Sequence, residues 1–179
     1  MESSFIVRTV VQRSRFAEVI IENQSQGKME RGLVLLFGVG FSSDVEDWKI
    51  KKENIENQDS TLVIKSILPK LEKFAEKILS LRIFTDSEEK MNLSLKDISG
   101  GLYVVSQFTL FADCKKGNRP GFSSALKPTI AKLIYEKFIE IIQLKYRKEQ
   151  IFTGQFGADM QVILCNDGPV TIILEDDLL

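Results

Sequence analysis

The chain contains an unbroken apolar run over residues 32–39 (Gly-Leu-Val-Leu-Leu-Phe-Gly-Val), closed by Gly38 and Gly40. A strand with one face in water alternates apolar and polar side chains, whereas a strand covered on both faces is apolar throughout. We therefore predict a central strand that is buried on both faces. Such a strand needs other elements packed on each side of it.

Other β-rich segments surround this run. Residues 5–11 and 19–21 precede it, and the polar stretch 22–28 reads as a turn, so these segments and the apolar run predict a β-meander. Residues 102–110 predict a further strand. Residues 161–164 and 170–174 predict a hairpin-like pair of strands around a turn at Gly168 and Pro169.

Apolar residues spaced by three and four positions predict helices over residues 67–81 and 129–146. Pro69 then falls in the first turn of the earlier helix, where its missing N–H costs little. The order of elements predicts an α+β fold. Its mostly antiparallel β-sheet closes into a barrel-like core, and two main helices pack on that sheet.

A length of 179 residues fits a single domain over 1–179. Residues 42–66 are polar and charged, and we interpret them as a surface insertion in this domain. Ser43 and Glu46 have the spacing of a capping box, which predicts the start of a short helix there.

Composition excludes several classes of function. The net charge is −1, which does not suit a protein that wraps duplex DNA, so nucleic-acid contacts should be local. No apolar run approaches the length of about 20 residues that spans a bilayer. Cys114 and Cys165 form no C-x-x-C pair, so a disulfide framework is not expected and a reducing, cytoplasmic location is the simpler interpretation. The chain contains no histidine and no recognisable metal-binding or cofactor-binding motif, so we expect neither a bound metal ion nor a cofactor.

Two motifs combine polar groups with β-rich flanks. Residues 106–110 (Ser-Gln-Phe-Thr-Leu) end a predicted strand, in which Phe108 and Leu110 should alternate in direction with Gln107 and Thr109. The cluster can present several hydrogen-bond donors to one ligand, or its hydroxyls can simply bond to nearby backbone.

The second motif is residues 166–171 (Asn-Asp-Gly-Pro-Val-Thr). A cis bond between Gly168 and Pro169 would point two carbonyls in nearly the same direction, whereas a trans bond would leave an ordinary turn. The loop 154–160 adds Phe156 and Met160, which either stack on a base or fill the core.

Taken together, these motifs resemble those of the D-aminoacyl-tRNA deacylases, which remove D-amino acids mischarged onto tRNA. The similar segments occur in the family's order and cover most of the chain outside 42–66. They are residues 11–13, 32–39, 81–84, 90–93, 105–110, 118–120, 154–162 and 166–171. The segment 42–66 is longer than the family pattern, and the order around Arg15 also departs from it.

The resemblance implies a homodimer of barrel-like subunits whose active sites lie at the subunit interface. Ser106, Gln107, Phe108 and Thr109 would form the catalytic floor. Gly168 and Pro169, joined by a cis bond, would reach into the partner's site as a chiral gate. Arg13 would steady the gate, Phe156 would lie near the terminal adenine of tRNA, and Met160 would line the pocket.

The implied reaction is hydrolysis of the ester in D-aminoacyl-tRNA, and a glycyl ester would also pass such a gate because glycine has hydrogen on both sides. Backbone N–H groups near Phe108 and Thr109 are suited to an oxyanion. The terminal 2′-hydroxyl can assist water, which we rank above direct attack by Thr109. Three alternatives stay open: a sister deacylase that removes an L-amino acid, a non-catalytic tRNA-binding module and a small-molecule carrier.

Overall fold

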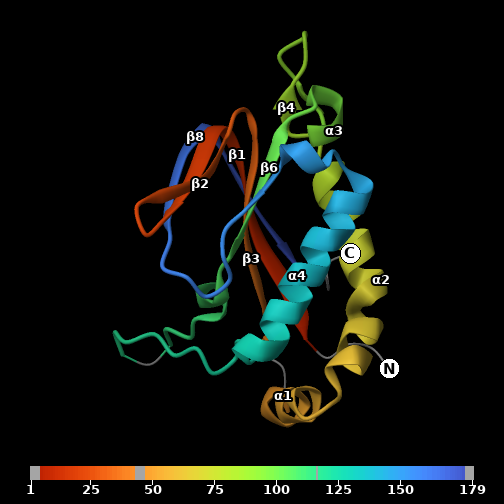
Figure 1. The fold of residues 1–179 in the computed structure, drawn as a ribbon, viewed down its shortest axis with the longest axis vertical. Coiled ribbons are helices and arrows are strands. Elements are labelled where there is room, and N and C mark those ends of the chain that lie inside the picture. The colour runs from red at the N-terminus through yellow and green to blue at the C-terminus, as the bar shows by residue number, and fades with distance from the viewer. Residues whose placement is uncertain (1–4, 43–46, 116, 176–179) are drawn as a thin grey trace.

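The computed structural model describes residues 5–42, 47–115 and 117–175 (Figure 1). The apolar run forms β3 (Gly32–Gly40), which pairs antiparallel with β1 (Ile6–Ile21) and parallel with β6 (Gly101–Ser106). Leu35 and Phe37 enter the core cluster shared with the helices, and Val34 enters a second cluster on the opposite face. The prediction that this strand is buried on both faces is confirmed.

β1 is one continuous strand where the sequence predicted two. Its residues 6–14 pair with β3, and residues 17–21 pair with β2 (Gln24–Met29). The polar residues in its middle do not mark a break, because Arg13 and Ser14 are buried and donate to backbone carbonyls. The turn lies at Glu22 and Asn23, whose φ angles are 49° and 63°. The predicted three-segment meander is therefore wrong, since β1 pairs with both β2 and β3.

β8 (Gln161–Glu175) runs along the other edge of β1. The predicted hairpin around Gly168 and Pro169 is wrong, because the residues on both sides of this pair bond to the same neighbouring strand. Thr171 pairs with Gln12 and Asn166 pairs with Ser14, so residues 167–170 bulge out of the ladder.

The sheet curls into a nearly closed barrel. β7 (Ile151–Thr153) pairs in parallel with β6, and the Tyr103 hydroxyl on β6 donates to the Gly27 carbonyl in β2 at 3.4 Å. The α+β class and the barrel-like core are confirmed. The sheet is mixed, however, because β3, β6 and β7 run parallel to one another and need long crossover connections.

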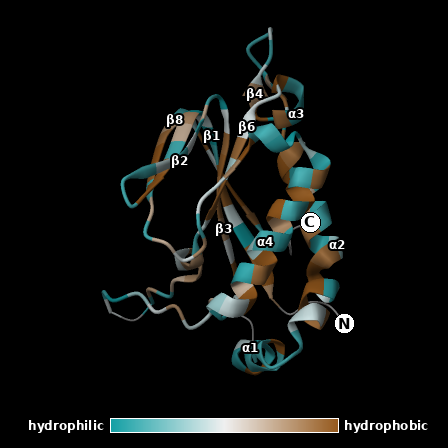
Figure 2. Cartoon of the chain, in the orientation of Figure 1, coloured by the Kyte–Doolittle hydropathy of each residue, from teal (hydrophilic) through white to brown (hydrophobic). Residues whose placement is uncertain are grey.

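The crossovers contain α2 (Ser60–Leu79) and α4 (Pro128–Lys145), which lie side by side against one face of the sheet (Figure 1). Both helices alternate hydrophobic and hydrophilic segments (Figure 2). The Phe138 ring of α4 lies 4.6 Å from the Phe37 ring and 6.2 Å from the Phe74 ring, measured between centroids. This aromatic contact joins α4, β3 and α2 in one core.

α2 begins earlier than predicted. Its N-cap is Asp59, whose carboxylate accepts the Thr61 N–H at 2.7 Å. Pro69 therefore lies inside the helix rather than in its first turn. Pro69 and Lys65 are both exposed, so water can satisfy the Lys65 carbonyl that proline leaves without a helical partner.

The predicted insertion 42–66 contains α1 (Trp48–Glu56) and the first turns of α2. Ser43 and Glu46, the predicted capping box, lie outside the described residues. The remaining short elements are β4 (Phe84–Thr85), β5 (Met91–Leu93), α3 (Leu95–Ile98), η1 (Phe108–Phe111) and η2 (Lys148–Gln150). Within the described ranges, no helix combines the length and apolar character needed to cross a bilayer.

Candidate functional site

The first motif does not continue as a strand. β6 ends at Ser106, and the chain enters the 3₁₀ turn η1, so the predicted alternation of Phe108 and Leu110 with their neighbours is wrong. The Gln107 N–H makes a last bond to the Phe37 carbonyl at 2.7 Å. Gly38 permits this close approach, because a Cβ there would lie 2.7 Å from the Gln107 carbonyl oxygen.

Arg8 of β1 fixes the far end of η1. Its guanidinium donates to the Leu110 carbonyl at 2.7 Å and lies 4.8 Å from the centre of the Phe111 ring. It also pairs with Glu175 at the end of β8. The Ser124 hydroxyl donates to the Phe111 carbonyl at 2.9 Å. η1 is thus tied to both β1 and the segment before α4.

The start of η1 carries two free backbone donors. Among the described residues, no acceptor bonds to the N–H groups of Phe108 and Thr109. Initial N–H groups of a helix have no partner within it, so they are available to a negatively charged oxygen. The Gln107 side-chain amide donates to the Thr109 hydroxyl.

A cavity of about 610 Å³ opens beside this turn. It brings together five of the predicted site residues from two parts of the chain, namely Ser106, Gln107, Phe108, Phe156 and Met160. Thr109 is exposed and is not among the described residues that line the cavity. The volume is typical of sites for small organic groups.

Sequence reasoning missed several residues of the cavity wall, including Lys52, Phe122, Lys127 and Tyr135. Burial raises the pKa of the Tyr135 phenol, which stays protonated and donates to the Val104 carbonyl at 2.9 Å. Tyr135 therefore supports the wall as a neutral hydrogen-bond donor. The residue spacing in α1 and α4 does not predict that these side chains lie in the same cavity wall as the first motif.

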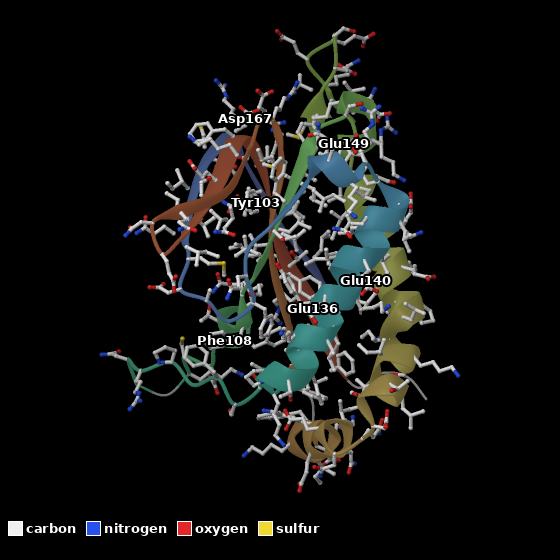
Figure 3. The ribbon with its side chains drawn as sticks, viewed as in Figure 1. Tyr103, Phe108, Glu136, Glu140, Glu149 and Asp167 are labelled. Atoms are coloured by element: carbon white, nitrogen blue, oxygen red, sulfur yellow. The ribbon has the colours of Figure 1, made fainter. Side chains whose placement is uncertain are left out.

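The second motif lies elsewhere in the same chain. In Figure 3, Asp167 and Phe108 are labelled at opposite ends of the sheet. Gly168 has a φ of 125°, and the Gly168–Pro169 peptide bond is cis. Neither residue lines the cavity described above, and neither does Arg13. The structure thus divides the predicted site residues into a cavity set and a distant set.

The distant set is held rigidly. Arg13 is 7% exposed and donates to the Asp167 carbonyl at 3.0 Å and the Ile83 carbonyl at 2.6 Å. Arg15 pairs with the Asp167 carboxylate at 2.9 Å, and this hydrogen bond holds the pKa of Asp167 below its usual value. The backbone beside Gly168 is therefore fixed by two arginines.

The strand that carries this set has an open edge. β8 pairs with β1 only, among the elements described, and it exposes 42% of Ile163 and 63% of Ile173. An unpaired edge with exposed isoleucines is a surface on which another chain can pack. No group of three or more potential metal-binding side chains gathers in the described ranges.

The chain matches the family model described as D-Tyr-tRNA(Tyr) deacylase over residues 66–175. A D-aminoacyl-tRNA deacylase from Thermosipho africanus is 44% identical over 169 residues, covering 94% of this chain and 97% of that protein. One from Thermotoga petrophila is 42% identical over 173 residues, covering 97% and 99%.

Two solved structures are also similar. The c-Myc DNA unwinding element binding protein is 35% identical with a TM-score of 0.73, covering 93% of this chain and 97% of that one. A probable eukaryotic D-amino acid tRNA deacylase is 14% identical with a TM-score of 0.71, covering 95% and 99%, and so shares the fold.

Proposed function

The chain belongs to the D-Tyr-tRNA(Tyr) deacylase family and hydrolyses D-aminoacyl-tRNA; we propose that the cavity beside η1 holds the ester and the terminal adenosine. The observation that carries the chemistry is the pair of N–H groups on Phe108 and Thr109, which have no acceptor among the residues that the structure describes. They are donors for the oxygen that becomes negative when water attacks the ester carbonyl.

The proposed reaction proceeds by addition and elimination. Water adds to the carbonyl carbon, and the two amides stabilise the tetrahedral oxyanion. The bond from this carbon to the ribose oxygen then breaks, the ribose oxygen takes a proton, and the free amino acid leaves. Because the chain has no histidine, the neighbouring 2′-hydroxyl of the substrate assists the attacking water.

The proposal includes a homodimer in which Gly168 and Pro169 of one copy close the cavity of the other. Two observations support it: these residues lie away from the cavity of their own chain, and the open edge of β8 exposes isoleucines. The Gly168 and Pro169 carbonyls, which follow the Asp167 carbonyl held by Arg13, would crowd an L side chain on the substrate Cα but admit hydrogen. A glycyl ester would also enter, because its Cα carries two hydrogens.

Phe156 and Met160 supply apolar wall to the cavity, and we assign Phe156 to stacking on the terminal adenine. The partner is therefore the aminoacylated 3′ end of tRNA, and the cytoplasm is the matching location. Under this proposal Ser106 and Gln107 line the floor, and Thr109 contributes its backbone N–H rather than its hydroxyl.

The decisive experiment compares release of D-tyrosine and L-tyrosine from charged tRNA by the purified protein. We expect rapid release of the D form and negligible release of the L form. Preferential L release would identify a sister deacylase instead. Binding of charged tRNA without release of either amino acid would indicate a non-catalytic module. One structural relative is named as a DNA-binding protein, which makes this alternative worth testing.

A further inference from the structure

The cavity has a basic end that the proposed chemistry does not use. Lys52 of α1 and Lys127, the N-cap of α4, both line it. The Lys52 ammonium donates to the Ser123 carbonyl at 2.6 Å and lies 3.6 Å from the Glu56 carboxylate. Only 20% of the Lys52 side chain is exposed, so these contacts hold its ammonium group against the cavity wall.

The balance of charge at this end is positive. Glu56 faces two lysines, because its carboxylate also lies 3.4 Å from the Lys127 ammonium. It accepts the Lys127 backbone N–H at 2.8 Å as well, so it caps α4. Two ammonium groups and one carboxylate leave a net charge of about +1, beside the positive end of a helix dipole.

The negative charge of the cavity lies elsewhere. Asp159 is the other charged residue in the wall among those that the structure describes, and it comes from the loop before β8. Asp159 also lines a neighbouring cavity of about 520 Å³ together with Glu22. The wall thus has a basic end at α1 and α4, and an acidic side at Asp159.

Lys52 retains donor capacity for a ligand. An ammonium carries three N–H donors; the Ser123 carbonyl accepts one of them, and Glu56 at 3.6 Å is an ion-pair partner beyond hydrogen-bond distance. An anion at this end would complete its hydrogen bonds and balance the surplus positive charge. The rest of the wall is largely apolar, so an anion without this partner would be costly to place there.

We propose that Lys52, with Lys127 beside it, binds the phosphodiester group that precedes the terminal nucleoside of the substrate. This inference rests on the proposed function, because the substrate brings one phosphate with its terminal nucleoside. α1 lies outside residues 66–175 that match the family model. The segment 42–66 thereby contributes a binding residue to the active site and is more than a surface addition.

The test compares two small substrates that differ only in this phosphate: 3′-O-D-tyrosyl adenosine and its 5′-monophosphate. Lys52→Met should raise KM for the phosphate-bearing ester by about tenfold, at unchanged kcat, and leave the nucleoside ester unaffected. With charged tRNA, the salt dependence of KM should fall by about 0.7 in log–log slope. Lys52→Arg keeps the charge and should restore most of the binding.

Lys51→Met is the matched control, since Lys51 lies one position along α1 and is not among the residues lining the cavity. It should leave KM for both esters unchanged. Equal impairment of both esters by Lys52→Met would overturn the phosphate assignment, because it would mean that Lys52 only braces Ser123. An unchanged KM for both esters would overturn it too.

A binding measurement separates this inference from the proposed reaction. Calorimetry with adenosine 5′-monophosphate and with adenosine should show tighter binding of the nucleotide, and Lys52→Met should abolish the difference. Equal affinity of the wild-type protein for both would refute the phosphate subsite, even if D-esters are hydrolysed. If the protein does not hydrolyse D-esters but still prefers the nucleotide in a way that depends on Lys52, only the proposed reaction is refuted.

Discussion

The contribution of the Phe108 backbone donor can be isolated by comparing two substitutions that both remove the ring. Phe108→Pro removes the N–H group, and proline suits the first position of a helical turn. The preceding residue, Gln107, has a φ of −146° and a ψ of 83°, so it already lies outside the α region that a following proline disfavours. We expect kcat to fall by about 10²- to 10³-fold relative to Phe108→Ala, which removes the ring but keeps the donor. Equal kcat values for the two variants would exclude an oxyanion role for this amide.

Thr109 offers the contrasting experiment on a side chain. Thr109 is exposed, and its hydroxyl accepts a hydrogen bond from the Gln107 amide, a group that cannot take the hydroxyl proton. Thr109→Ala should therefore retain kcat to within about tenfold in single-turnover assays, because the proposed nucleophile is water and the N–H group remains. Abolished turnover with intact tRNA binding, restored by Thr109→Ser, would assign the attack to threonine.

Gly168 is a position where any side chain is expected to disturb the second motif. A Cβ there would lie 2.9 Å from Arg13 Nη2 and 2.9 Å from Val170 Cγ2, at a φ of 125°. Gly168→Ala should lower kcat/KM by at least about tenfold, because it displaces the backbone that Arg13 steadies. Gly117→Ala is the control, since Gly117 also has positive φ but has nothing within 4 Å of the added Cβ. Similar activity of both variants would contradict the gate.

At the scale of elements, η1 depends on a guanidinium from another strand. Arg8→Met removes the bond to the Leu110 carbonyl and the contact with the Phe111 ring. We expect kcat to fall by about tenfold with little change in KM, because the turn loses its position but the cavity keeps its wall. Arg8→Lys should recover part of kcat. A lower melting temperature with unchanged kcat would show that Arg8 serves stability alone.

The elements that sequence predicted well are those with local patterns. β3 is apolar throughout, and α2 and α4 repeat apolar residues at helical spacing. The errors arose where distant contacts decide the outcome. Buried Arg13 and Ser14 keep β1 continuous by bonding to carbonyls of remote segments, and the bulge in β8 is set by its register against β1. Such contacts leave no periodic signal.

The sequence predicted part of the candidate site and missed the residues whose positions depend on contacts between distant segments. The resemblance named Ser106, Gln107, Phe108, Phe156 and Met160, and the structure brings them to one cavity. Lys52 could not be found from its neighbours in sequence, because its position depends on contacts with Ser123 and Glu56. In the sequence alone, a lysine in a polar stretch cannot be distinguished from a lysine on a solvated surface, because its neighbours in space are set by the tertiary fold.

At the scale of the whole molecule, the cavity and the Gly168–Pro169 motif occupy different regions of one chain, so the proposed site would need two copies to be complete. A C2 dimer would have two such sites, each built from both chains. Ile173 exposes 63% of its surface on the open strand β8. Charge at that position should oppose association and reduce activity most strongly at low protein concentration.

Mixing two impaired variants tests this shared site directly. Phe108→Pro damages the cavity and Gly168→Ala damages the gate, so each homodimer has two defective sites. After exchange of subunits, a heterodimer contains one site with two intact halves and one site with two damaged halves. Random exchange makes about half of the dimers heterodimers, so the mixture should recover about a quarter of wild-type activity. Activity no greater than the mean of the separate variants would mean that each chain uses its own gate.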